Sequence, residues 1–250
     1  MSEPRPSNKP QMDDPAYRLA VLDRDFVLGD TTRGIRFQLE YQKAEEALRA
    51  RKIESTVVVF GSARVHEGDP SGWYEQARAF GKLCSEKGGA KNKSDSALQN
   101  VIATGGGPGI MEAANRGAYD AGAPNIGYNI TLPMEQEPNP FSTPDLTFRF
   151  HYFAMRKMHF AMRAAALVVF PGGFGTFDEL FELLTLRQTG KMTKNLPVVL
   201  YDSHFWNKAV NLKHLADTKL INTKDLDLFT MADTPQGAWD ALLKRGLKVY

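Results

Sequence analysis

The chain has 250 residues, 42% of them hydrophobic, and a formal net charge of +2 from 31 basic and 29 acidic side chains. This length and apolar content suit one large domain, and the near balance of charge argues against bulk binding of nucleic acid or membranes. The single cysteine, Cys84, excludes an intrachain disulfide and a cysteine metal cluster.

The start of the chain, residues 1–15, is polar and rich in proline, so we expect a disordered terminus and no signal peptide. The longest unbroken apolar run, 164–170, is far too short for a membrane span. A cytoplasmic protein is therefore expected, with residues 16–250 forming one domain that carries an N-terminal helical extension. A polar stretch, 88–100, is expected to be a loop.

Apolar spacing and β-branched runs alternate along the rest of the chain. Strand, glycine turn and helix follow one another repeatedly, which predicts a parallel sheet with helices on both faces, a doubly wound, Rossmann-like α/β fold. Helices are expected at 33–52, 73–87, 110–119, 154–165, 177–187, 205–216 and 235–245, and strands at 56–60, 101–104, 125–130, 147–153, 167–170 and 197–201.

Three glycine turns follow predicted strands, at Gly61-Ser62, Gly105 to Gly109, and Gly172 to Thr176. In parallel sheets, ligands bind beyond the carboxyl ends of the strands. The second turn lacks the spacing of a dinucleotide fingerprint, and no lysine follows Gly175 as a P-loop requires, so neither NAD nor ATP is supported. Glycines that open a helix favour close approach of a phosphate, although tight turns alone would also use them.

The segment Thr176-x-x-Glu179 precedes an apolar-periodic helix and has the form of a capping box. From this pattern alone, capping is the favoured role of Glu179, which is expected off the core face. Upstream, Arg156 lies at the start of the predicted helix that precedes the strand leading to the third glycine turn. Arg163, further along that helix, is expected to be solvated.

Arg156-Lys157, followed by PGG-x-GT-x-x-E from Pro171 to Glu179, resembles the signature of the LONELY GUY family, cytokinin riboside 5′-monophosphate phosphoribohydrolases formerly labelled lysine decarboxylase-like. GGGPGIMEAANRGA resembles the family's other glycine turn, and the likeness runs from about Val57 to Tyr201. The N-terminal extension and the polar stretch 88–100 depart from the short plant members and are similar to larger bacterial relatives, whose substrate can be an ordinary nucleotide.

The resemblance implies hydrolysis of a nucleoside 5′-monophosphate, AMP-like or a cytokinin riboside monophosphate, to free base and ribose 5-phosphate. It implies no cofactor and no metal, and a homodimer or higher homo-oligomer whose partner chain completes the site. Arg156 and Glu179 are carried over as the catalytic pair. The expected substrate-binding residues are Gly61, Ser62, Gly105, Gly106, Gly107, Gly109, Met111, Glu112, Met155, Lys157, Pro171, Gly172, Gly173, Gly175 and Thr176.

Two other functions compete with this one. A non-catalytic carrier of a phosphorylated ligand, similar to molybdenum-cofactor carriers, would explain both glycine turns without chemistry. A decarboxylase would need pyridoxal phosphate and a Schiff-base lysine. Lys157 is the only lysine within a matching motif, which makes the decarboxylase the least favoured of the three.

Overall fold

The computed structural model describes residues 4–91, 96–133, 137–192 and 195–249. Residues 1–3 of the predicted disordered terminus and residues 92–95 of the predicted polar loop lie outside this range. The chain divides into two compact units, Met1–Lys43 and Ala44–Tyr250. Among the described residues, none of the helices combines the length and apolar character that crossing a lipid bilayer requires.

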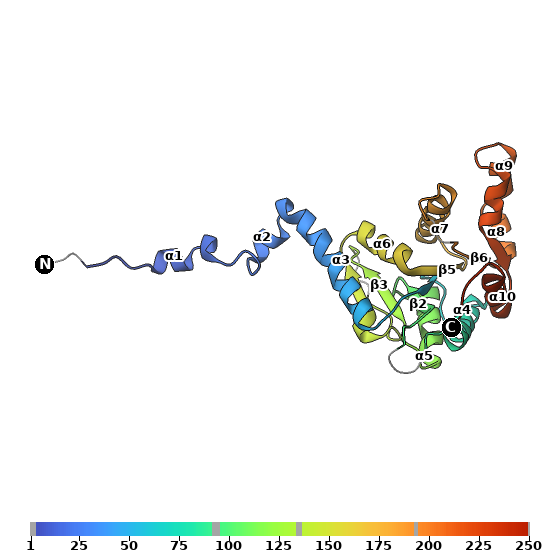
Figure 1. Ribbon diagram of the computed structural model, residues 1–250, viewed down its shortest axis with the longest axis horizontal. Coiled ribbons are helices and arrows are strands. Elements are labelled where there is room, and N and C mark those ends of the chain that lie inside the picture. The colour runs from blue at the N-terminus through green and yellow to red at the C-terminus, as the bar shows by residue number, and fades with distance from the viewer. Residues whose placement is uncertain (1–3, 92–95, 134–136, 193–194, 250) are drawn as a thin grey trace. The chain divides into compact units, whose positions relative to one another are not determined.

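The larger unit is built on a seven-stranded sheet in which every pair of neighbouring strands is parallel, in the order β4-β3-β2-β1-β5-β6-β7. The predicted doubly wound fold is therefore confirmed (Figure 1). The strands are β1 (Thr56–Phe60), β2 (Val101–Thr104), β3 (Ile126–Ile130), β4 (Thr147–Phe150), β5 (Ala164–Val169), β6 (Val198–Tyr201) and β7 (Thr230–Ala232).

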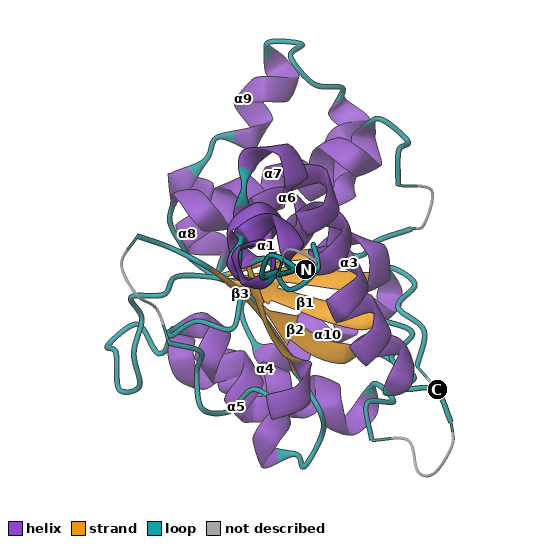
Figure 2. Ribbon diagram, turned by 90° about the vertical axis from the view of Figure 1, so that its left-hand side faces the viewer, coloured by secondary structure: helices purple, strands orange, loops and turns teal. Residues whose placement is uncertain are grey.

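Helices cover both faces of this sheet (Figure 2). The core splits accordingly, because successive side chains of a strand point to opposite faces. In β1, Val58 and Phe60 join one hydrophobic cluster, while Val57 and Val59 join the other. The first cluster packs on α3 (Arg33–Ala50), α6 (Phe153–Arg163), α7 (Phe174–Gln188), α8 (Ser203–Ala209) and α9 (Leu212–Asp217), and the second on α4 (Trp73–Lys87), α5 (Ile110–Asp120) and α10 (Pro235–Lys244).

The strand order reverses at β1. The chain proceeds from β1 outward to β4 on one side and then returns to β5 on the other side. The turns after β2, β1 and β5 therefore meet at one edge of the sheet, at the topological switch point where ligands bind in folds of this kind.

The structure differs from the predicted elements near the C-terminus. The single helix predicted at 205–216 is two helices, α8 and α9, because the side chain of Asn211 caps α9 by accepting a hydrogen bond from the amide of His214. Strand β7 was not predicted, since its three residues are too few to show periodicity. The described part of the chain also has 3₁₀ turns at η3 (Pro144–Leu146) and η4 (Thr223–Leu228).

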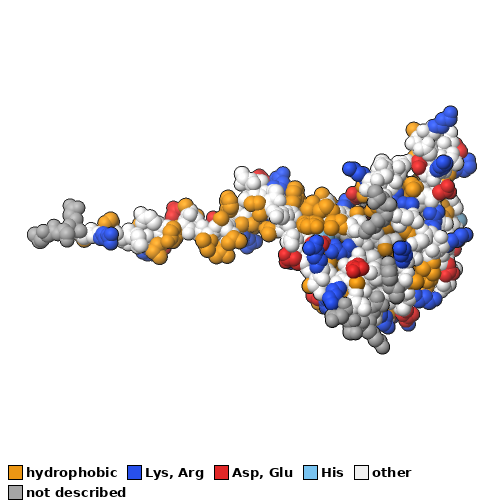
Figure 3. Space-filling model, in the orientation of Figure 1, with side chains coloured by type: hydrophobic (Ala, Val, Ile, Leu, Met, Phe, Trp, Pro, Cys, Tyr) orange, Lys and Arg blue, Asp and Glu red, His pale blue; other side chains and the backbone are white. Residues whose placement is uncertain are grey.

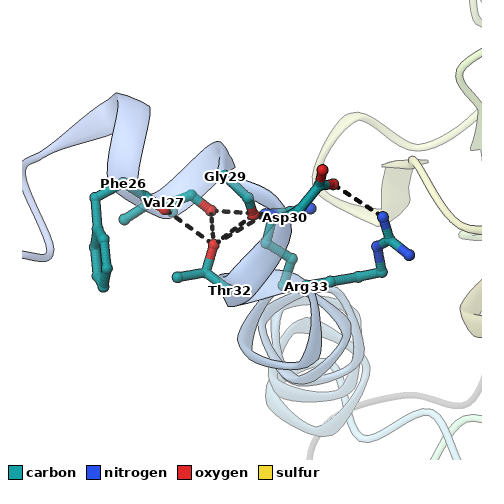
Figure 4. Close-up of polar contacts among 7 residues, drawn as sticks. Phe26, Val27, Gly29, Asp30, Thr32 and Arg33 are labelled. Atoms are coloured by element: carbon teal, nitrogen blue, oxygen red, sulfur yellow. Dashed lines mark hydrogen bonds and ion pairs between the residues drawn. The ribbon is translucent and has the colours of Figure 1, made fainter.

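The N-terminal unit contains α1 (Lys9–Asp13), η1 (Pro15–Tyr17), α2 (Arg24–Leu28), η2 (Asp30–Thr32) and the first turns of α3. Its polar centre is Thr32, whose hydroxyl lies 2.8 to 3.0 Å from the carbonyl oxygens of Phe26, Val27 and Gly29 (Figure 4). Apolar side chains lie exposed along this unit (Figure 3). They include Tyr17, Leu19, Val21, Leu22, Phe26 and Leu28.

Candidate functional site

Backbone hydrogen bonds join the three predicted ligand turns at the switch point. The amide of Ser62 donates to the carbonyl of Pro171 at 2.9 Å, and the amide of Ile110 donates to the carbonyl of Ser62 at 3.0 Å. The turn after β1 thus lies between the turns after β2 and β5. The structure brings the three segments together as the sequence predicted.

Five glycines in these turns pack closely against other groups of the protein, namely Gly61, Gly105, Gly106, Gly109 and Gly172. A β-carbon on Gly105 would lie 2.5 Å from a guanidinium nitrogen of Arg156. Gly109 has a φ of +73°, and a side chain there would collide with the carbonyl oxygen of Ser62. Gly173 and Gly175 differ, because nothing lies within 4 Å of a β-carbon built on either residue. These two glycines leave open space beside the backbone, as close approach of a ligand requires.

A buried amide network holds the second turn from behind. Asn139 donates through its backbone amide to the carbonyl of Gly106 at 2.8 Å, and through its side chain to the carbonyl of Gly107 at 3.1 Å. The same side chain donates to Asn115, which also accepts from the hydroxyl of Thr104 at 2.6 Å. Asn115 and Asn139 are both buried. Sequence reasoning missed them, although Asn115 lies within the second glycine motif.

A pocket of about 990 Å³ opens where the three turns meet. Eight predicted site residues line it, from the turn after β1, the start of α5, and helices α6 and α7. They are Gly61, Ser62, Met111, Arg156, Gly173, Gly175, Thr176 and Glu179.

Arg156 extends from the first turn of α6 into this pocket and is held rigidly. Its Nε donates to the carbonyl of Tyr128 at 2.8 Å, and its guanidinium lies over the ring of Phe160, with 5.3 Å from Cζ to the ring centroid. Burial lowers the pKa of Arg156, and the nearby Glu179 carboxylate opposes that shift. The guanidinium remains charged, because the ordinary pKa of arginine is far above neutrality.

Glu179 lies on α7 and faces the pocket with only 6% of its surface exposed. Burial raises the pKa of its carboxyl to about 7, and the charges of Arg156 and Lys157 only partly oppose this effect. Among the described residues, no side chain or backbone group donates a hydrogen bond to this carboxylate, and no ion pair joins it to Arg156. A carboxyl in this state is suited to accept or release a proton near neutrality.

The predicted capping box is wrong. Helix α7 begins at Phe174 with Gly173 as its N-cap, so Thr176 and Glu179 both lie inside the helix, and no side chain caps its first turn. The amide of Thr176 donates to the carbonyl of Gly173 instead. The expected position of Glu179 off the core face is also wrong, since Glu179 is buried together with Leu180 and Leu183.

Four predicted site residues point away from the pocket or are engaged elsewhere. Met155 packs against the hydrophobic core, and Pro171 and Gly172 form the turn behind the pocket wall. Lys157 forms ion pairs with Asp178 at 2.8 Å and Glu182 at 2.9 Å.

Glu112, predicted to bind substrate, lies outside the lining of the pocket. The hydroxyl of Tyr74 donates to the carboxylate of Glu112 at 2.7 Å. Gly105, Gly106, Gly107 and Gly109 form the turn beneath the pocket, where Gly105 abuts Arg156 and Met111.

Sequence reasoning missed several residues that line the pocket. Arg64, four positions after the end of β1, adds a second guanidinium. Phe153 and Phe174 add aromatic rings, and Phe174 is 96% exposed. The sequence signal that was available for Phe174 is its position between two glycines of a predicted ligand turn. Among the described residues, no group of three or more His, Cys, Asp or Glu side chains is arranged to hold a metal ion.

Comparison with solved structures bears on the fold. The molybdenum cofactor binding protein of Rippkaea orientalis superposes with a TM-score of 0.52 at 18% identity, covering 76% of this chain and 96% of that protein. A Moco carrier protein of Chlamydomonas reinhardtii superposes with a TM-score of 0.52 at 21% identity, covering 78% of this chain and 99% of the other. At such low identity, the likeness extends to the fold alone.

Comparison of sequences identifies the family. The cytokinin riboside 5′-monophosphate phosphoribohydrolase LOG2 of Arabidopsis thaliana is 26% identical over 166 residues, 58% of this chain and 76% of that protein. LOG4 of the same plant is 23% identical over 175 residues, 64% of this chain and 80% of the relative. A family profile described as "Possible lysine decarboxylase" matches residues 111–242, which is more than half of the chain. The chain therefore belongs to the LONELY GUY family, the group that this profile describes as possible lysine decarboxylases.

Proposed function

We propose that the chain hydrolyses the N-glycosidic bond of a nucleoside 5′-monophosphate and releases the free base and ribose 5-phosphate. The observation that carries this proposal is the convergence of Arg156 and Glu179 in one pocket beside two glycine turns. The relatives named as phosphoribohydrolases support hydrolase chemistry at the level of the family.

The proposed phosphate position lies between the first turns of α5 and α7. Each helix end carries unpaired amide groups and a partial charge of about +0.5, which favours an anion. Neither helix has a side chain that caps its first turn. The open space beside Gly173 and Gly175 lets phosphate oxygens approach the backbone of α7.

The proposed chemistry requires a carboxylate near the ribose. Breaking the bond between C1′ and the base develops positive charge on the ribose ring, as in glycoside hydrolysis. We assign the stabilisation of that charge to Glu179 in its ionised form. Water then bonds to C1′, and the electron pair of the broken bond leaves with the base, which gains one proton. Arg156 lies beside Glu179, where its charge favours the ionised carboxylate.

Decarboxylation through pyridoxal phosphate does not fit this site. A Schiff-base lysine must present a neutral amine, which requires a lowered pKa. Burial opposes the charge of Lys157, but its bonds to Asp178 and Glu182 outweigh burial and raise its pKa. Its ammonium group is occupied by these two carboxylates, and Lys157 is absent from the lining of the pocket that holds Arg156.

As part of the same proposal, the protein is a cytoplasmic homodimer or higher homo-oligomer. Exposed rings at the rim of the pocket, Phe153 and Phe174, support an association surface there. Light scattering of the purified protein measures the molar mass directly, and a monomer at micromolar concentration would refute this part of the proposal.

A panel of monophosphates tests the proposed reaction. The purified protein is incubated with AMP, GMP, CMP, UMP and a cytokinin riboside 5′-monophosphate, and the free base is measured by chromatography. We expect release from at least one of them, together with an equal amount of ribose 5-phosphate. If calorimetry shows that a monophosphate binds but no base is released, the protein is a carrier of phosphorylated ligands and not a hydrolase.

A further inference from the structure

Arg64 differs from every other basic side chain near the site. It follows β1 at the edge of the sheet, and its backbone amide donates to the hydroxyl of Ser62 at 3.1 Å. This bond fixes the local turn and leaves the side chain exposed on the lining of the pocket. Within the described part of the chain, the guanidinium of Arg64 takes part in no hydrogen bond, ion pair or ring contact.

Two other cations in the described structure near this pocket, Arg156 and Lys157, are already engaged. Arg156 is fixed by the carbonyl of Tyr128 and the ring of Phe160, and it lies beside the buried Glu179. Lys157 binds Asp178 and Glu182. Arg64 is therefore the one cation lining the described pocket whose side chain is available to a ligand.

The balance of charges in the pocket indicates that Arg64 can pair with a phosphate. A phosphate monoester carries about two negative charges at neutral pH. The first turns of α5 and α7 together supply about one positive charge. The charge of Arg156 is matched by Glu179 when that carboxyl is ionised. One further positive charge beside the helix ends completes the balance, and a planar guanidinium binds phosphate oxygens through two parallel hydrogen bonds.

We propose that Arg64 binds the 5′-phosphate of the substrate and so makes the site selective for phosphorylated nucleosides over free nucleosides. This inference rests on the proposed function, because it concerns the same pocket. The side chain adopts its bound position when the ligand enters, since no protein group holds it beforehand. Arg64 acts in binding, whereas Arg156 and Glu179 act at the ribose.

The experiment compares Arg64→Ala and Arg64→Lys with the wild type on AMP and adenosine. For Arg64→Ala, we expect KM for AMP to rise about 10- to 100-fold, as loss of a charge-assisted hydrogen bond produces, with kcat little changed. The KM of Arg64→Lys for AMP should lie between those of the wild type and Arg64→Ala. The selectivity for AMP over adenosine, given by the ratio of the two kcat/KM values, should fall in Arg64→Ala by about the same factor. The matched control is Arg149→Ala, another exposed arginine, on β4 and outside the pocket.

A binding measurement separates this inference from the proposed reaction. Calorimetry with ribose 5-phosphate and with ribose is carried out on the wild type and on Arg64→Ala. Ribose 5-phosphate binding that weakens in Arg64→Ala supports the role of Arg64 even if no base is released from any nucleotide. Equal affinity of the two proteins for ribose 5-phosphate, or no binding by the wild type, would overturn the inference even if AMP is hydrolysed.

Discussion

Helix α6 carries an arginine near a glutamate at each of its ends, and the two pairs behave in opposite ways. At its last residue, Arg163 binds Glu45 through two hydrogen bonds of 2.6 and 3.0 Å. In its first turn, Arg156 lies near Glu179 without an ion pair between them in the described structure. Both glutamates are almost completely buried, at 4% and 6% exposure.

The pKa values of the two glutamates express this difference. Hydrogen bonds from Arg163 outweigh burial and lower the pKa of Glu45 to about 2. Burial dominates at Glu179 and raises its pKa to about 7. The same two residue types therefore stabilise the fold at one end of α6 and, at the other, leave a pocket-facing carboxyl to which no described protein group donates a hydrogen bond. A largely buried carboxyl with a raised pKa that faces a pocket is the pattern expected where a ligand interacts with it.

Replacing Glu179 by Gln should have the largest effect. The amide keeps the shape but removes the charge that we assign to stabilising the ribose, so base release should fall about 10³-fold. The rate is measured by chromatography under single-turnover conditions. If Glu179→Gln keeps the wild-type rate, Glu179 has a structural role and does not act in catalysis.

Glu45→Gln should disrupt the other arginine–glutamate pair, and we expect it to lower stability without changing base release. It leaves Arg163 buried beside a neutral amide, which should lower the free energy of unfolding by about 3 kcal/mol. Urea denaturation measures the loss, and base release per folded molecule should stay at the wild-type value. If Glu45→Gln unfolds at the wild-type urea concentration, the pair contributes nothing to stability.

The pH dependence of the free energy of unfolding should differ between the wild type and Glu179→Gln. A carboxyl whose pKa is higher in the folded protein than in the unfolded chain favours folding at low pH, and this contribution is lost as the pH rises through the folded pKa. Between about pH 4.5 and 7, the wild type should lose about 2 to 3 kcal/mol relative to Glu179→Gln. Parallel stability curves for the two proteins across this range would contradict the raised pKa.

Asn139→Ala should have the smallest effect, because it disturbs the site only through the second glycine turn. Removing the side chain leaves the carbonyl of Gly107 and one lone pair of Asn115 without a donor. We expect a loss of about 1 to 2 kcal/mol in unfolding free energy and a several-fold rise in KM for AMP. Ser142→Ala, a nearby buried hydroxyl that bonds to Asn139 rather than to the turn, is the control. An unchanged KM in Asn139→Ala would show that the turn holds its position without this network.

The features of the fold and of the site that depend on local pattern could be predicted from the sequence. Alternating strands and glycine turns predicted the doubly wound sheet, and its topology brings the three turns together at one edge. Contacts between distant segments could not be predicted from local pattern. Arg163 was expected to be solvated because its partner, Glu45, lies 118 positions away in the chain. Asn139 likewise joins a loop to a turn 32 positions earlier.

The role of Glu179 shows a different limit. Thr176-x-x-Glu179 satisfies the spacing of a capping box, but the helix begins at Phe174, so the pattern describes the interior of a helix. Gly173 and Gly175 concealed that start, since glycine disfavours helix in local propensity. Burial of Glu179 follows from the packing of α7 in the tertiary structure, which is not encoded within four residues.

The two arginine–glutamate pairs of α6 have separate tasks under this hypothesis. Its most direct test measures base release from AMP, or from the best monophosphate of the panel, for the wild type, Glu179→Gln and Glu45→Gln at equal concentrations of folded protein. We predict release by the wild type and by Glu45→Gln at similar rates, and about 10³-fold less by Glu179→Gln. Equal loss in both variants, or undiminished release by Glu179→Gln, would contradict the account.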